Sequence, residues 1–313
     1  MAKNTIYYVF TLPPVSGGHF VSLEHIAALN AMGFNAKVYY VGPPDGFAKF
    51  TVPAVRAGAP LLPDDIIVVG EDHKPLLQQL KSMSCIRVLH NQNPYYTFAG
   101  FDSAADLFSY PLTRVIVPST FCADRLGAMG MTQPISRVRP AVPDYFAPAE
   151  KRLQIAFSPR KRMIEALFLK GYFQARAPEY AHLPWVALNN MTRRDCAGAM
   201  AQACVYAALP HLESLGLMNL EAMASGCHVV GYTGQGGTEY ATPENGDWIT
   251  EGDHDAFVEN LRDACRLYES AQPNPKIAAS RATAAKFSRT VFEQELRETW
   301  LAIMGDRAEL YRN

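Results

Sequence analysis

Residues 204–240 read CVYAALPHLESLGLMNLEAMASGCHVVGYTGQGGTEY. Apolar runs at Cys204–Ala208 and His228–Tyr232 predict two strands, and the pattern between them predicts a helix over Leu215–Ser225. Strands that are continuous apolar runs, rather than alternating ones, are typical of a parallel sheet that is covered on both faces. Gly226 follows the helix as a residue that can adopt the left-handed conformation of a helix end. The stretch therefore predicts a strand–helix–strand unit of an α/β protein.

The same alternation extends through the chain on both sides of a proline-rich segment at Pro140–Pro148, which reads as an extended linker. The other predicted strands are Thr5–Leu12, Ala36–Val41, Asp65–Gly70, Ile86–His90, Val115–Val117, Leu153–Phe157 and Trp185–Leu188. The other predicted helices are His19–Met32, Pro75–Ser82, Phe121–Met129, Arg162–Ala175, Arg193–Ala203, Asp255–Glu269, Pro275–Phe287 and Val291–Met304. Two α/β halves, joined near residues 140–150, follow from this order.

Composition excludes several classes of protein. The 313 residues carry 29 Lys plus Arg and 30 Asp plus Glu, a net charge of -1, so no overall basic field exists to hold nucleic acid. The amino-terminal segment lacks the pattern of a signal peptide, and no run reaches the ~18 apolar residues of a spanning helix. The six cysteines show no zinc-site spacing. We expect buried thiols in a cytoplasmic protein; contact with a membrane surface or a protein partner stays open.

Loops at the carboxyl ends of parallel strands are where ligands bind in such sheets. After the first strand, Gly17 and Gly18 precede a helix and would present amide groups to an anion or a polar substrate; the alternative is a tight turn. This loop is not the G-x-G-x-x-G fingerprint, which argues against a nicotinamide oxidoreductase. After another strand, His90 is followed by Asn91–Asn93, and we expect these polar groups to point toward the ligand. A structural histidine is the alternative.

In the second half, the first strand is followed by three cations, Arg160, Lys161 and Arg162. Arginine can bind a phosphate through two parallel hydrogen bonds, and lysine adds a point charge. In a nearly neutral protein this triplet predicts a local anion site; a solvated basic loop is the alternative.

Glu213 lies just before the predicted helix, and Glu221 lies eight residues further along the chain, within it. Eight helical residues make two turns plus about 80°, with a rise of roughly 12 Å, so both could face one side and hold an extended ligand at two points. Glu221 lies in an apolar helix and needs a partner if it is buried. The helix start at Ser214–Gly216 would offer amide groups to a diphosphate. A glycine loop follows the next strand, with Gly236, Gly237, Thr238 and Glu239.

The segment from Glu213 to Tyr240 resembles the donor-site motif of the retaining GT-B glycosyltransferases of family 4. Three further segments are similar to that family: VIVPSTFCADRL, RVRPAVPDYFAP and FSRTVFEQELRETWLAIMG. The resemblance covers most of the chain. It implies two Rossmann-like domains: an amino-terminal domain over 1–145 on the acceptor side and a donor domain over 146–288. A helix over 289–313 would return to the first domain. A nucleotide sugar would lie in a cleft between the two domains.

The resemblance also implies roles for the candidate residues. Glu213 would contact the donor sugar, Glu221 the ribose hydroxyls, and Arg160 with Lys161 the diphosphate. Five residues beyond the arginine, where the family usually has a lysine, this chain has Glu165. His90 would face the donor sugar. The full predicted set is Glu213, His90 and Arg160 as catalytic residues, with Gly17, Gly18, Arg160, Lys161, Glu213, Ser214, Leu215, Gly216, Glu221, Gly236, Gly237, Thr238 and Glu239 binding the donor.

The function implied is transfer of a sugar from a nucleoside diphosphate to a glycan or another polar acceptor. Developing negative charge on the diphosphate would be stabilised by cations and a helix start, so we expect neither a metal nor a cofactor. A nucleotide-sugar-binding subunit without activity of its own is the alternative, and a nucleotide-sugar epimerase is a further one. A role in polysaccharide biosynthesis follows only through the family.

Overall fold

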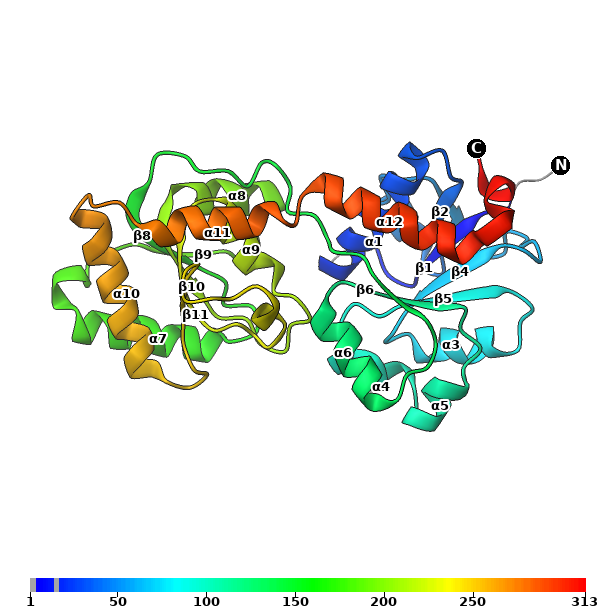
Figure 1. Ribbon diagram of the computed structural model, residues 1–313, viewed down its shortest axis with the longest axis horizontal. Coiled ribbons are helices and arrows are strands. Elements are labelled where there is room, and N and C mark those ends of the chain that lie inside the picture. Colours follow the sequence, from blue (N-terminus) through cyan, green and yellow to red (C-terminus); the bar gives the residue numbers. More distant parts are fainter. Residues whose placement is uncertain (1–3, 14–16) are drawn as a thin grey trace. The chain divides into compact units, whose positions relative to one another are not determined.

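The computed structural model describes residues 4–13 and 17–313. Contacts divide the chain into two units (Figure 1). Unit 1 consists of Met1–Pro140 and Phe292–Asn313, and unit 2 of Ala141–Val291. The boundaries expected from the sequence were at residues 145 and 288. Each unit is an α/β layered structure with a parallel sheet, as the apolar runs predicted.

Unit 1 contains a seven-stranded sheet of order β3-β2-β1-β4-β5-β6-β7, with every ladder parallel. The strands are β1 Ile6–Phe10, β2 Ala36–Tyr40, β3 Ala54–Arg56, β4 Ile66–Gly70, β5 Ile86–His90, β6 Arg114–Val117 and β7 Ile135–Arg137. Its helices are α1 Gly17–Ala31, α2 Pro44–Phe47, α3 Lys74–Lys81, α4 Thr97–Gly100, α5 Ala104–Ser109 and α6 Thr120–Met129, with 3-10 turns η1 Pro94–Tyr96 and η4 Gly305–Tyr311. The strand order reverses between β1 and β4, which opens a crevice at their carboxyl ends.

The helix α12, Arg289–Met304, brings the end of the chain back to unit 1. Trp300 is fully buried, and its ring centroid lies 6.2 Å from that of Tyr8 in β1. Glu295 accepts hydrogen bonds from the backbone N of Arg139 at 2.8 Å and from its Nε at 2.9 Å. Residues far apart in the sequence therefore complete one core.

Unit 2 contains a five-stranded parallel sheet of order β12-β11-β10-β8-β9. The strands are β8 Arg152–Phe157, β9 Trp185–Ala187, β10 Ala203–Ala208, β11 His228–Gly231 and β12 Asp247–Trp248. The helices are α7 Met163–Arg176, α8 Arg193–Gln202, α9 Leu217–Ala224, α10 His254–Glu269 and α11 Pro275–Ala285, with 3-10 turns η2 Pro178–Tyr180 and η3 Gly236–Glu239. The order reverses between β8 and β10, so the loops after these strands flank the crevice where ligands bind in such sheets.

Both faces of this sheet are covered (Figure 1). Ile155 and Phe157 of β8 pack with α7 and α10, whereas Ala156 packs with α8 and α9 on the other face. This two-sided burial explains why β10 is a continuous apolar run and why β8 ends in one, Ile155–Phe157. Across the described part of the chain, no helix has the length and apolarity that crossing a bilayer requires.

Candidate functional site

Lys161 and Glu213 meet at the crevice of unit 2. Lys161 follows β8 and Glu213 follows β10, and Lys161 Nζ lies 2.8 Å from Glu213 Oε1. The ammonium also donates to the carbonyl of His211 at 2.9 Å. Both side chains of the pair remain partly exposed. The structure therefore brings two sequence-predicted residues into direct contact at the place where a ligand is expected.

The other two cations of the triplet diverge. Arg160 is exposed, and the described contacts of the chain include no hydrogen bond or ion pair of its side chain. Arg162 turns inward: it donates to the carbonyl of Pro210 at 3.2 Å, pairs with Glu165 at 2.6 Å and stacks over Tyr232 at 5.1 Å. The sequence treated the triplet as one anion site, and this is wrong for Arg162, because packing against Tyr232 and Glu165 uses its charge to fix the loop.

The carboxylates Glu213 and Glu221 do not share a helix. The helix α9 begins at Leu217, and Gly216 before it has a left-handed φ of 76°. Leu212 also has a positive φ of 49°. The argument that both carboxylates can reach one side applied helical angles from Glu213 onward, and this is wrong because the chain between Glu213 and Gly216 is not helical. Glu213 instead forms an isolated parallel bridge with Gln235.

The glycine loop after β11 is fixed to the Glu213 loop. Glu213 N donates to Gly234 O, and Gly236 N donates to Glu213 O, each at 3.0 Å. Gln235 has φ 70° and ψ −63°, and Gly236 N also bonds Gly234 O at 3.0 Å, which defines a γ-turn of the rare, strained kind. Strain of this sort costs about 1–3 kcal/mol and is found at ligand sites.

Gly236 is required by close packing in this loop. A Cβ on Gly236 would lie 2.2 Å from the carbonyl carbon and oxygen of Ser214. Of the other predicted loop residues, Gly237 is buried, Thr238 is exposed and Glu239 is half-buried. Ser214, Leu215 and Gly216 are buried. They lead into the first turn of α9, where backbone N–H groups lack intrahelical acceptors.

Glu221 is buried in α9, with 5% of its surface exposed, and its partner is Arg193. Arg193 Nη2 and Nε donate to Glu221 Oε1 at 2.8 and 3.1 Å. The prediction that a buried Glu221 needs a partner is confirmed. Sequence reasoning missed Arg193, although its place immediately after Thr192, the capping residue of α8, at a predicted strand–helix junction could have indicated it.

In unit 1, the helix α1 begins at Gly17. Gly17 and Gly18 both lie within this helix. Gly18 O accepts a hydrogen bond from Gln92 Nε2 at 3.1 Å, which links the loops after β1 and β5. The remainder of the predicted glycine loop, residues 14–16, lies outside the described residues.

His90 is buried at the end of β5, with 3% of its surface exposed. Its Nδ1 lies 3.3 Å from Ser22 Oγ, and its ring centroid lies 4.8 Å from that of His25. Burial lowers the pKa of His90 to about 3, so the imidazole is neutral. The expectation that the following amides point to a ligand is wrong for Asn91 and Asn93, because these buried side chains bond Thr97 and cap the turn at Tyr95. The catalytic role of His90 stays a prediction.

Glu71 is a functional candidate that sequence reasoning missed. It follows β4, is 5% exposed, and accepts hydrogen bonds from the backbone N of Gln92 at 3.1 Å and of Asn93 at 2.8 Å. Burial raises the pKa of this carboxyl to about 7. The strand-end rule applied to Asp65–Gly70 would have found it. Glu71 holds the loop that follows His90.

The pKa of Glu71 predicts a pH dependence of stability. A carboxyl that titrates near 4.5 when unfolded and near 7 when folded binds more protons in the folded state between those values. The free energy of unfolding should therefore fall as pH rises through this window, by at most ~1.4 kcal/mol per pH unit from one group, and level off above it. Urea unfolding of wild type and Glu71→Gln at several pH values measures the difference. Exposed Glu298→Gln is the control; equal slopes in all three proteins would contradict the prediction.

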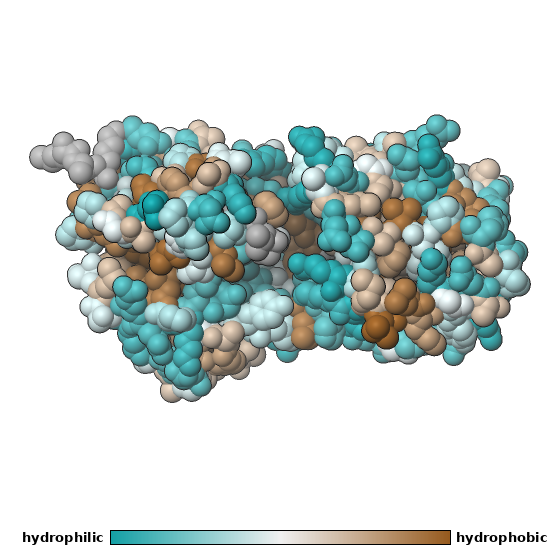
Figure 2. Space-filling view, turned by 180° about the vertical axis from the view of Figure 1, so that it is seen from behind, coloured by the Kyte–Doolittle hydropathy of each residue, from teal (hydrophilic) through white to brown (hydrophobic). Residues whose placement is uncertain are grey.

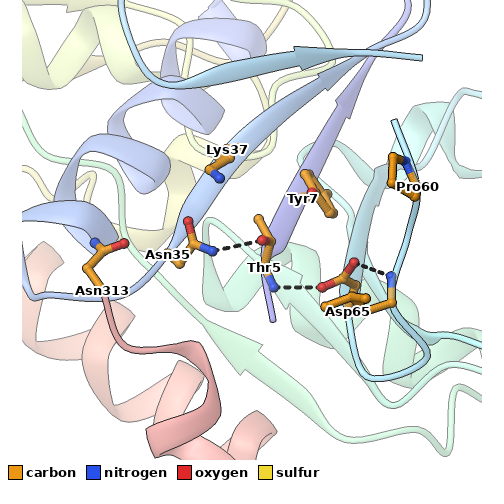
Figure 3. Close-up of a pocket in the computed structure, with 8 residues that line it drawn as sticks. Thr5, Tyr7, Asn35, Lys37, Pro60, Asp65 and Asn313 are labelled. Atoms are coloured by element: carbon orange, nitrogen blue, oxygen red, sulfur yellow. Dashed lines mark hydrogen bonds between the residues drawn. The ribbon is translucent and has the colours of Figure 1, made fainter. Parts of the chain in front are cut away.

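A hollow of 510 Å³ lies at the opposite, amino-terminal edge of the unit 1 sheet (Figure 3). Its polar groups bond to one another: Asp65 Oδ1 accepts from Thr5 N at 2.7 Å, and Asn35 Nδ2 donates to Thr5 Oγ1 at 2.8 Å. None of the sequence-predicted site residues lines it. The candidate site therefore stays with the loops at the carboxyl ends of the strands.

Known proteins resemble this chain in sequence and in fold. The family described as Glycosyl transferases group 1 matches residues 186–278. An alpha-1,6-glucosyltransferase of Actinobacillus pleuropneumoniae serotype 7 is 35% identical over 309 residues, which cover 94% of each chain. In fold, the chain is similar to a glycosyltransferase from Rickettsia africae, with a TM-score of 0.72 and 14% identity over 98% of this chain and 100% of that one. It is also similar to Anabaena HepE, solved in complex with UDP and glucose, with a TM-score of 0.72 and 14% identity over 96% and 100% of the chains. The chain belongs to the GT-B glycosyltransferases.

Proposed function

We propose that this glycosyltransferase moves glucose from UDP-glucose to a hydroxyl group of a glycan or another polar acceptor, with retention of anomeric configuration and without a metal ion. The observation that carries the proposal is the ion pair of Lys161 and Glu213 at the strand-order reversal of unit 2. The glucosyltransferase relative and the UDP and glucose bound to HepE support the choice of donor.

The chemistry assigned to the pair follows from its charges. Cleavage of the glycosidic bond produces positive character on the sugar and negative charge on the departing diphosphate. Lys161 has three N–H donors, so it can bind a phosphate oxygen while it retains Glu213. Exposed Arg160 and the first turn of α9 add donors to the same charge. Glu213 accepts hydrogen bonds from sugar hydroxyls, and Glu221, oriented by Arg193, accepts them from the ribose.

Two observations support metal independence. The cations described above can stabilise the diphosphate, and the two carboxylates of the one Asp-x-Asp sequence near the site already bond other protein groups. This sequence is formed by Asp253 and Asp255. Asp253 caps α10 by accepting from Ala256 N at 3.0 Å, and Asp255 accepts from the hydroxyl of Tyr172. Both carboxylates thus have structural partners. The six cysteines are free thiols, which supports a reducing, cytoplasmic compartment.

The test is titration of the protein with UDP-, GDP- and dTDP-glucose by calorimetry, followed by turnover assays with glucan and glycopeptide acceptors in the presence of EDTA. We expect selective binding of UDP-glucose and an α-linked product by NMR. Glu213→Gln should retain most UDP binding but lose turnover, because the variant changes a group near the sugar rather than the nucleotide. Exposed Glu244→Gln in the same unit is the matched control. Failure of the folded protein to bind any nucleotide sugar, or an inverted product, would overturn the proposal.

A further inference from the structure

The helix α7 is apolar on two faces. On its inner face, Ala166, Leu169 and Phe173 are buried against the sheet and α10. On its outer face, the exposed fractions are 47% for Met163, 79% for Ile164, 58% for Leu167 and 52% for Phe168. Figure 2 shows hydrophobic surface gathered over this helix, at the lower right of that view. An apolar face of a helix is normally packed against another element, and the outer face of α7 has no such cover within the described part of the chain.

The outer face carries no charge. At 100° per residue, its members fall within about 140° of the helix circumference. They are Met163, Ile164, Leu167, Phe168, Gly171, Gln174 and Ala175. The charged residues of α7 lie outside this arc: Glu165 bonds Arg162 and Tyr232, and Arg176 pairs with Glu259 at 3.2 Å. Lys170 lies just beyond its border, about 20° from Met163. Absence of charge together with Met and Phe is the composition of the core of a protein–protein interface.

Large and small residues are segregated along this face. The bulky apolar residues occupy its amino-terminal half. In its carboxyl-terminal half Gly171 and Ala175 are small, and Gln174, near the edge of the face, donates to the carbonyl of Ala181 at 3.1 Å. A Cβ on Gly171 would meet nothing within 4 Å, so nothing within the unit requires a small residue there. In an antiparallel pair about a two-fold axis near Leu169, Ile164 of one copy faces Ala175 of the other, and Phe168 faces Gly171. The face is therefore complementary to itself, as an interface with two-fold symmetry requires.

Neighbouring charges argue against a lipid surface. The helix α10 packs beside α7, and its residues Asp255 and Glu259 bond Tyr172 and Arg176. These carboxylates would face an anionic bilayer. On α7 itself, Lys170 is the only cation besides Arg176, and Arg176 is paired with Glu259. Membrane-surface helices usually border their apolar face with several Lys or Arg residues.

We propose that the outer face of α7 is the interface of a homodimer, in which two copies pack α7 against α7 in antiparallel orientation. The proposal does not depend on the donor or the acceptor. In this dimer, the exposed apolar residues of α7 are covered by a second copy of the chain. The small residues of one copy leave the space that the bulky residues of the other copy fill.

The experiment is sedimentation equilibrium of the full chain over a wide concentration range. Wild type should sediment as a dimer. Leu167→Glu should weaken association by roughly tenfold or more, because it places a charge in the apolar centre of the interface. Gly171→Leu should do the same by filling the space needed by Phe168 of the second copy, and the open surroundings of Gly171 predict that each unit still folds. Leu310→Glu, a 48% exposed leucine in unit 1, is the matched control and should leave the dimer intact.

Orientation is tested with chains that carry both Ile164→Cys and Ala175→Cys. Within one helix these positions are about 16 Å apart, too far for an internal disulfide, so mild oxidation should link position 164 of one copy to position 175 of the other, as mass spectrometry of the peptides will show. A wild type that stays monomeric, a dimer that survives both Leu167→Glu and Gly171→Leu, or a dimer without the 164–175 link would overturn the proposal. So would binding to phosphatidylserine vesicles by a monomeric wild type that Leu167→Glu abolishes.

Discussion

Replacing Lys161 by methionine is expected to lower kcat by about 10²–10³ with a smaller change in the KM of the donor. The variant keeps the apolar stem of the side chain but removes the ammonium that binds Glu213 at 2.8 Å and the His211 carbonyl at 2.9 Å. In the proposed reaction that charge acts mainly after the glycosidic bond starts to break, so its loss should affect the transition state more than donor binding. Initial rates over a range of donor concentrations measure the two constants separately.

Lys81→Met is the matched control, because Lys81 pairs with an aspartate on the surface of unit 1 and lies in neither candidate loop. Near-ultraviolet circular dichroism should show that the folded loop persists in Lys161→Met, since the Glu213 backbone remains bonded to Gly234 and Gly236. A folded variant whose kcat stays within about threefold of wild type would exclude Lys161 from leaving-group stabilisation, since threefold corresponds to only ~0.7 kcal/mol.

Gly236→Ala is expected to destabilise unit 2 by about 2–4 kcal/mol and to weaken nucleotide-sugar binding severely. The new methyl group would lie 2.2 Å from the backbone carbonyl of Ser214, and backbone atoms cannot move aside as a side chain can. The Glu213 loop and the glycine loop would have to separate, which breaks the bond from Gly236 N to Glu213 O. Thermal unfolding and calorimetric titration with the donor measure the two effects.

The adjacent glycine provides the control. A Cβ on Gly237 would lie 3.2 Å from the hydroxyl of Tyr240 and 3.4 Å from the Cβ of Thr233, contacts that small side-chain shifts can relieve. Gly237→Ala should therefore cost less than about 1 kcal/mol of stability. If the two variants behave alike, the close approach at Ser214 is not what makes glycine necessary at position 236.

Much of the fold was predictable because a strand that is buried on both faces is apolar at consecutive positions of the sequence. Strands such as Ile66–Gly70 and Ala203–Ala208 are continuous apolar runs that lie at sheet centres. The edge strands Ala54–Arg56 and Asp247–Trp248 were not predicted. They are short and only partly buried, so they carry no apolar run from which a strand could be inferred.

The sequence indicated which residues belong in the candidate site, but it did not indicate how those residues are arranged. Strand ends indicated Lys161 and Glu213, but their contact joins loops 52 residues apart, and the order of strands that brings them together cannot be read from local pattern. The helix-based geometry of Glu213 failed because Leu212 and Gly216 adopt positive φ, which is a result of tertiary packing. Arg193 was missed for a similar reason, since its partner Glu221 is 28 residues away.

The return of α12 to unit 1 fixes an order of events during synthesis. Unit 2 is one continuous stretch, Ala141–Val291, whereas unit 1 lacks Phe292–Asn313 until the last part of the described chain has been made. Until then, Tyr8 and His25 lack the rings of Trp300 and Phe292 that lie against them in the finished fold. A chain emerging from the ribosome therefore completes its second half first, and its amino-terminal half must wait with an apolar face uncovered. Truncations just before Phe292 should for this reason yield protein whose amino-terminal half is captured by chaperones, while the half that contains Lys161 and Glu213 is already folded.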